Sequence, residues 1–198
     1  SELKETILGI DPILGSTTEL AQALTLAVGK GFVPPDGGEA TRRFLTDVAT
    51  FGRAIGQGPV QAMETLTEVL GAYNLRAEDA SRISNALFGI GLRVGTQNLQ
   101  GVINGVERLA PAAQQLGIGF DESAAALETL AQSGLGAFRS TFALRQVFAT
   151  LTERADVFRQ KFGIDLKDAI GKQGLVGALE LLLTATRGNK DAQKELGL

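Results

Sequence analysis

Apolar residues recur every three or four positions along almost the whole chain, a period typical of amphipathic helices. The first well-marked helix is predicted over residues 17–29, because Ser16 and Glu19 in front of it form a capping-box signature. Another is predicted over 39–55, and the next begins at Pro59, since proline fits the first helical position. No segment alternates apolar and polar residues with a period of two. The pattern predicts an all-α fold, a compact, weakly repetitive bundle of roughly eight to ten short helices.

Three short corners interrupt the helical pattern about 45 residues apart, a spacing in the range of helical repeats. They begin at Asn74, Gly117 and Gly163, each followed by leucine or isoleucine and then by acidic residues. Glycine and asparagine accept the left-handed backbone that ends a helix, and the apolar residue packs back on its last turn. The acidic residues face the positive end of the next helix. Each corner is therefore predicted to be a tight αα-corner.

Helix boundaries between and after the corners follow the same logic. A helical stripe ends before Gly95, and Thr96 is the candidate N-cap of the helix that follows. Pro111 either kinks that following helix or begins a new one. A later helix carries an apolar stripe made of Leu144, Val147, Phe148 and Leu151. Residues 155–162 either continue this later helix or form a helix of their own, and a final polar turn is expected up to Leu196.

Two features are candidate contact sites, and each also has a purely structural explanation. The loop 30–38 is rich in proline and glycine, and we expect its Phe32 and Val33 to pack into the core; if exposed, they would make it a contact loop. Gly101 and Gly105 lie one turn apart inside a predicted helix, where glycine costs about 1 kcal/mol relative to alanine. They predict a close helix contact, either within the chain or with another copy.

The domain organisation is predicted from the strength of the pattern. Residues 59–198 form the strongly patterned part, which we expect to fold as one helical core and to be a piece of a longer chain. Tyr73 lies on the apolar stripe of its first helix and is predicted to be buried. Residues 1–58 are expected to form a helical lead-in packed on this core.

Composition narrows the chemistry. The 198 residues include no histidine and no cysteine, so the commonest general base, the commonest neutral metal ligand and the thiolate nucleophile are missing. A net charge of −3 argues against nucleic-acid binding, which needs a basic surface. No apolar run approaches the ~20 residues that a membrane helix needs. We therefore expect no catalytic, cofactor or metal site and no small-molecule substrate.

Two short motifs resemble ones that carry chemistry in other proteins. Glu122 is followed by Ser123, a Glu-Ser pair that lytic transglycosylases use with glutamate as the general acid. The downstream glycine and aromatic signature of those enzymes is missing, and acids in a first helical turn have a structural explanation. Residues 89–95 (GIGLRVG) superficially suggest a phosphate loop, but the spacing is wrong and they follow a helix. The chain is predicted not to be an enzyme.

Short motifs occur in a fixed order along residues 59–198. In chain order they are Thr65-Leu66-Thr67, the Asn74-Leu75 corner, Ser84-Asn85-Ala86-Leu87, Leu109-Ala110-Pro111-Ala112-Ala113, the Leu116-Gly117-Ile118 corner, the stretch 126–135, Ala143-Leu144-Arg145, Phe162-Gly163-Ile164-Asp165 and Glu195-Leu196-Gly197. The ordered set resembles the shared helical region of phage tail tape measure proteins. One departure is Thr141-Phe142, where the family often has a small Ala-Gly pair; it bears on the local helix contact.

The resemblance implies a structural, non-enzymatic protein of the virion tail that is assembled in the host cytoplasm. It implies a role in tail assembly and length determination through contacts with tail tube and tail tip proteins, tail assembly chaperones and further copies of the chain. It also implies contact with the host envelope at ejection. Two other functions stay open: a generic helical scaffold or adaptor, and a cell-wall-degrading, transglycosylase-like module centred on Glu122.

Overall fold

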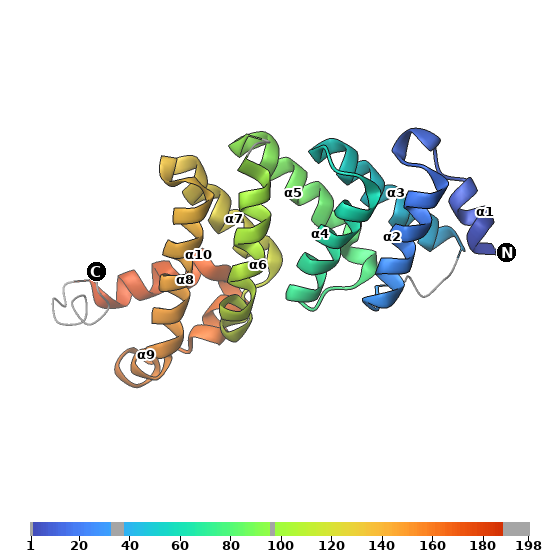
Figure 1. Ribbon diagram of the computed structural model, residues 1–198. Helices are drawn as coiled ribbons and strands as arrows, with labels where there is room; N and C mark the ends of the chain where they lie inside the picture. The colour runs from blue at the N-terminus through green and yellow to red at the C-terminus, as the bar shows by residue number, and fades with distance from the viewer. Residues whose placement is uncertain (1, 33–37, 96–97, 188–198) are drawn as a thin grey trace. The chain divides into compact units, whose positions relative to one another are not determined.

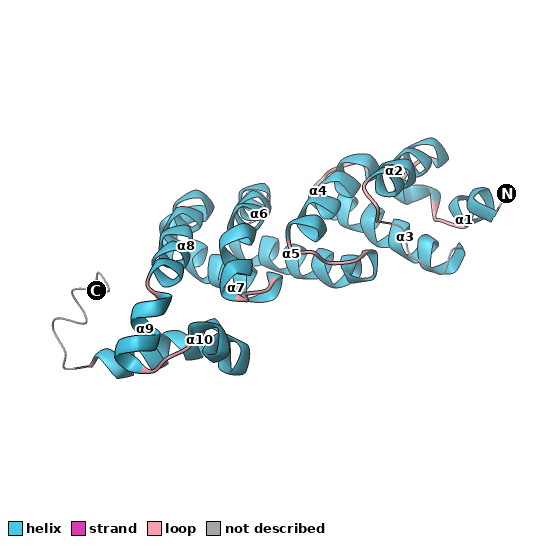
Figure 2. Cartoon of the chain, turned by 90° about the horizontal axis from the view of Figure 1, so that it is seen from below, coloured by secondary structure: helices cyan, strands magenta, loops and turns pink. Residues whose placement is uncertain are grey.

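Helices and the turns between them make up the structure, a computed structural model that describes residues 2–32, 38–95 and 98–187 (Figure 1). Figure 2 shows helices and loops only, and no strand occurs in these ranges. The predicted all-α fold is therefore confirmed for the described part of the chain. The chain forms two compact units, Ser1–Glu107 and Arg108–Leu198.

The first unit is built around α4. Its elements are α1 (Glu2–Leu8), a 3-10 turn (Pro12–Leu14), α2 (Thr17–Gly29), α3 (Gly38–Ile55), α4 (Pro59–Ala72), a second 3-10 turn (Ala77–Asp79), α5 (Ala80–Val94) and the first part of α6 (Leu99–Leu116). α4 packs against α2 and α3, and α3 packs against α5. Met63, Leu66 and Leu70 of α4 are completely buried, and each contributes about 1.5–3 kcal/mol through the hydrophobic effect. The domain division predicted after residue 58 stays a prediction.

The second unit holds the rest of α6 and four further helices. Its other elements are α7 (Phe120–Leu130), a π-helical turn (Ala131–Leu135), α8 (Gly136–Glu153), α9 (Ala155–Phe162) and α10 (Leu166–Thr186). α7 packs against α8, and α9 contacts both α8 and α10. Phe148 of α8 and Phe158 of α9 are fully buried, so aromatic side chains contribute to this largely aliphatic core.

Helix starts follow the sequence signals. At the start of α2, the Glu19 backbone N–H donates to Ser16 Oγ at 3.3 Å, and the Ser16 N–H donates to Glu19 Oε2 at 2.9 Å. This reciprocal pair is the predicted capping box. Pro59 is the first residue of α4, as predicted. The helix predicted over 39–55 is α3, which ends just before Gly56 (φ +74°).

All three predicted corners have a left-handed residue at the expected position: Asn74 (φ +53°), Gly117 (φ +79°) and Gly163 (φ +67°). At the first, the Leu75 N–H donates to the Leu70 carbonyl at 2.8 Å, and at the second the corresponding bond runs from Ile118 to Ala113 at 2.9 Å. These bonds occupy carbonyls that a helix end leaves without partners. The corners are therefore confirmed.

A further corner of this kind ends α2. Gly31 is left-handed (φ +80°), and the Phe32 N–H donates to the Ala27 carbonyl at 2.8 Å. The predicted pattern required acidic residues after the apolar one, and none follows Phe32 until Asp36, so this corner was not found from the sequence.

The alternatives left open by the sequence now have answers. Pro111 lies inside α6, which is one helix from Leu99 to Leu116. Residues 155–162 form a helix of their own, α9. Gly174 (φ +74°) breaks α10 into two helical segments, a break that the apolar pattern does not predict. The N-cap predicted at Thr96, the environment of Val33 and the final turn up to Leu196 lie outside the described residues.

The glycine pair in α6 is split between two environments, since Gly105 is buried and Gly101 is exposed. The partner of the predicted close contact stays a prediction. A close helix contact does occur at Gly52 of α3, where a Cβ atom would lie 2.8 Å from Ala62 Cβ of α4 and 2.8 Å from the Gln57 carbonyl oxygen. Glycine is required there because no side chain fits.

Candidate functional sites

Glu122, the candidate general acid, lies in the first turn of α7, and its carboxylate reaches the break in α10. The Leu175 backbone N–H donates to Glu122 Oε1 at 3.0 Å across a separation of 53 residues. Leu175 opens the second segment of α10, where the helix leaves N–H groups without intrahelical partners. A carboxylate at this positive end is favourable for both hydrogen bonding and charge. Glu122 therefore acts as a long-range helix cap.

The neighbours of Glu122 fit this structural role. Gly174 precedes the capped N–H, and a Cβ atom there would lie 2.7 Å from Glu122 Oε1. Ser123, the second residue of the Glu-Ser pair, is buried and donates its hydroxyl to the Gly119 carbonyl at 2.9 Å. Both side chains thus have structural hydrogen bonds, Glu122 to the distant start of a helical segment and Ser123 at the start of α7.

The glycine-rich stretch 89–95 belongs to α5 up to Val94 and ends at Gly95 (φ +91°). Gly91 is buried, and a Cβ atom there would lie 3.1 Å from Leu99 Cδ2. Residues 89–94 are helical, and Gly91 packs against Leu99 of α6. This stretch therefore forms no loop around a phosphate group.

Two further aromatic residues singled out in the sequence, Tyr73 and Phe32, differ in their degree of burial. Tyr73 is buried, as predicted, and its hydroxyl donates to the Val106 carbonyl at 3.0 Å. Phe32 is half-buried and lies against α4, where its ring would be 3.6 Å from a Cβ atom placed at Gly71. Phe32 is therefore mainly a packing residue.

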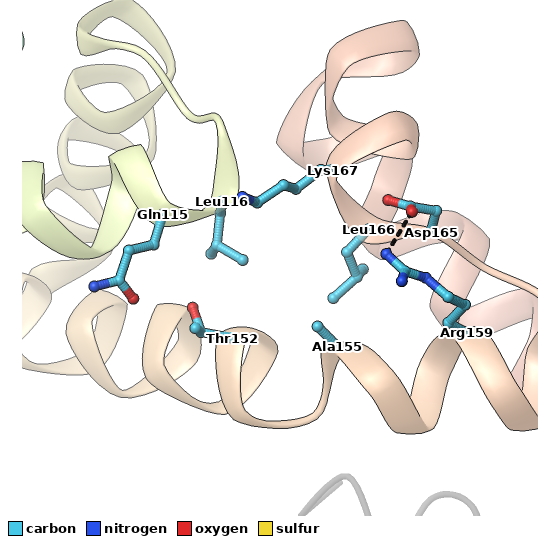
Figure 3. A pocket seen from close by; sticks show the side chains of 8 residues that line it. All are labelled: Gln115, Leu116, Thr152, Ala155, Arg159, Asp165, Leu166 and Lys167. Atoms are coloured by element: carbon cyan, nitrogen blue, oxygen red, sulfur yellow. Dashed lines mark hydrogen bonds and ion pairs between the residues drawn. The ribbon is translucent and has the colours of Figure 1, made fainter.

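A shallow depression of about 300 Å³ lies in the second unit, around the corner at Gly163 (Figure 3). It is lined by Gln115, Leu116, Thr152, Ala155, Arg159, Asp165, Leu166 and Lys167. Arg159 Nη2 and Asp165 Oδ2 form an ion pair at 2.7 Å, drawn as a dashed line in Figure 3. Asp165 also accepts a hydrogen bond from the Asp168 N–H at 3.1 Å and so caps α10.

The charged groups in this depression stabilise Asp165 as the cap of α10. The hydrogen bond from the Asp168 N–H, together with the charge of Arg159, lowers the pKa of Asp165 below its usual value. A carboxylate held ionised in this way accepts hydrogen bonds well and is a weak general acid or base at neutral pH. Among the described residues, no group of three or more potential ligand side chains could hold a metal ion.

The most exposed aromatic side chains of the second unit lie on α8. Phe138 is 77% exposed and Phe142 is 60% exposed. Val147, which was expected on the buried stripe, is 39% exposed, whereas the other members of that stripe are buried. Sequence periodicity did not show that Phe138 and Phe142 would point outward, although Phe142 belongs to the Thr141-Phe142 pair noted above as a departure from the resemblance. Thr141 beside it is buried, so the departure adds a large side chain on the outer side of the helix.

Comparison with known protein families gives a match over nearly the whole chain. A family model described as "Phage-related minor tail protein" matches residues 8–197, which also includes the weakly patterned first helices. No curated protein and no solved structure matches the chain. None of the described helices is long and apolar enough to cross a bilayer. Because the match extends over nearly the whole chain, with all three corners and the helices between them, the protein belongs to the phage-related minor tail protein family and has a structural role in a phage tail.

Proposed function

We propose that the chain is a tape-measure-type module that acts in tail assembly and length determination through protein–protein contacts, without catalysis. The observation that carries this proposal is the family match over residues 8–197. The capping role of Glu122 supports it, because the one candidate general acid has a structural use. Tail tube and tail tip proteins and assembly chaperones are the proposed partners, with assembly in the host cytoplasm.

Within such a protein, we propose that this segment is an anchoring module and not part of the ruler. As one continuous helix, 198 residues would extend about 300 Å at 1.5 Å per residue. The corners at Asn74, Gly117 and Gly163 fold the chain back within each unit and make the folded form a poor ruler. The competing possibility is that the segment converts to an extended helix inside the tail tube.

Tail length tests this proposal. Deleting residues 75–117 from the parent protein joins one corner to the next and removes about 65 Å of potential helix. An anchoring module predicts tails of unchanged length in electron micrographs. A duplication of the same segment provides the reciprocal variant in case the deletion prevents folding. Tails that shorten by about 65 Å, or lengthen by as much in the duplication, would show that the segment is part of the ruler.

The cell-wall-degrading alternative has its own test at Glu122. Purified protein and the Glu122→Gln variant are incubated with peptidoglycan, and soluble fragments are measured. We expect no release by either protein, because the carboxylate is engaged as a cap. Release by the wild-type chain that disappears in Glu122→Gln would support a transglycosylase-like module instead.

A further inference from the structure

The outer face of α8 carries a stripe of apolar side chains with an arginine on either side. At 100° per residue, Phe138, Phe142 and Ala149 share one side of the helix, and Arg139 and Arg145 lie on opposite flanks of it. All five are exposed. The buried residues of the same helix lie on the opposite side: Ser140, Thr141, Leu144, Phe148 and Leu151. We call the five exposed residues the Phe-Arg face.

The two arginines of this face lack carboxylate partners. Neither forms an ion pair with any residue in the described ranges, whereas Arg42 pairs with Glu39 and Arg159 with Asp165. Residues 136–152 contain no aspartate or glutamate, so α8 offers none until its last residue. Glu153 is exposed and lies on the same side of α8, one turn beyond Ala149. Between Phe138 and Ala149, the Phe-Arg face is therefore apolar along its centre and positive along both edges.

We infer that the Phe-Arg face binds an acidic amphipathic helix of a partner protein. Such a helix places its own apolar stripe on Phe138 and Phe142, and carboxylates on both sides of that stripe reach Arg139 and Arg145. Phenylalanines that are more than half exposed offer a large apolar area to bury on binding. The face extends for about 16 Å along α8, which matches a partner helix of about three turns.

Charge argues against the other possible occupants. A second copy docked symmetrically through this face would bring arginines against arginines, which is repulsive. Two arginines are too few to hold nucleic acid or an anionic membrane on a chain of net charge −3. An acidic amphipathic helix can bury the apolar stripe and also pair its carboxylates with Arg139 and Arg145 at the edges. The inference depends only on residues of the second unit and goes beyond the proposed length-setting role. The tail-length experiment can therefore contradict the anchoring proposal without affecting it.

The test uses the whole chain and two synthetic helical peptides, which share a leucine stripe and differ in having glutamates or lysines on both flanks. Fluorescence anisotropy measures their binding. We expect the glutamate peptide to bind and the lysine peptide not to bind. Phe138→Ala and Phe142→Ala should each weaken binding about tenfold or more, as loss of an aromatic anchor does. Arg139→Glu with Arg145→Glu should reverse the preference, so that the lysine peptide binds.

Leu92→Ala is the matched control, because Leu92 is 64% exposed on α5 in the other unit and should not affect binding. Circular dichroism checks that every variant is folded. Equal binding of both peptides, or an unchanged preference after charge reversal, would overturn the inference. Three other results would also overturn it if the glutamate peptide does not bind. The wild-type chain could bind phosphatidylglycerol vesicles, or it could bind an oligodeoxynucleotide. It could also form a dimer in sedimentation that Phe138→Asp abolishes.

Discussion

Individual residues with positive φ determine where this chain turns. Asn74, Gly117 and Gly163 were identifiable because each combines a left-handed former with an apolar residue and acids behind it. Gly174 has the same backbone sign but follows Gln173 in the middle of an apolar helix, so nothing local marks it. Its signal is the distant Glu122, and one sequence without a structure does not connect positions 53 residues apart.

Gly174→Ala should destabilise the protein by about 1–2 kcal/mol from the positive φ alone. The loss should be larger because the new Cβ atom would crowd Glu122 Oε1. Gly171→Ala is the matched control, since Gly171 lies in the same helix with nothing within 4 Å of its Cβ position. That control should be neutral or stabilising by up to about 1 kcal/mol. Urea unfolding measures both, and equal effects of the two substitutions would contradict the capped break.

Acid should weaken the cap at Asp165. Its folded-state pKa is lowered by the Asp168 N–H and by Arg159, so it binds a proton less readily folded than unfolded. The stabilisation is therefore fully present above the unfolded-state pKa of about 3.9 and is lost as pH falls through the lower folded-state value. Asp165→Asn should flatten the dependence of the unfolding free energy on pH below about 4. A steeper dependence in the variant would contradict this assignment.

At the scale of elements, periodicity and capping residues were sufficient for most of the fold. The helices predicted over 17–29 and 39–55 agree with α2 and α3 to within one residue. The features that the sequence did not predict depend on contacts between residues far apart in the chain. Periodicity alone did not show that the helix at residues 136–153 would have apolar side chains on both sides, because the exposed Phe138 and Phe142 are the same residue type as the buried Phe148.

Tyr73 ties the end of α4 to α6 through one buried hydrogen bond. Tyr73→Phe keeps the ring and removes only the hydroxyl, so it should cost about 1 kcal/mol in unfolding free energy. Tyr73→Ala should cost more, about 3–5 kcal/mol, because a cavity forms in the core of the first unit. Thermal and urea unfolding would reveal the order. A Tyr73→Phe variant as unstable as Tyr73→Ala would mean that the hydroxyl, not the ring, dominates.

At the scale of the whole molecule, family membership and fold agree, since a helical chain with corners suits a structural tail component. The absence of catalytic equipment was expected from composition and stays a prediction. The outward Phe-Arg face of α8 could not have been predicted from the sequence, because burial, and not residue type, distinguishes a contact stripe from a core stripe.

The central claim is that this segment works in its folded form, and one distance tests it most directly. Lys30 Nζ and Glu68 Oε1 are 3.7 Å apart in the folded first unit, whereas a continuous helix would separate these residues by about 57 Å. Residues 1–198 contain no cysteine, so Lys30→Cys with Glu68→Cys introduces the only two thiols of this segment for spin labels. In assembled tails we expect the short distance of neighbouring helices, about 10 Å between axes plus the label arms. A distance near 57 Å in tails would contradict the account.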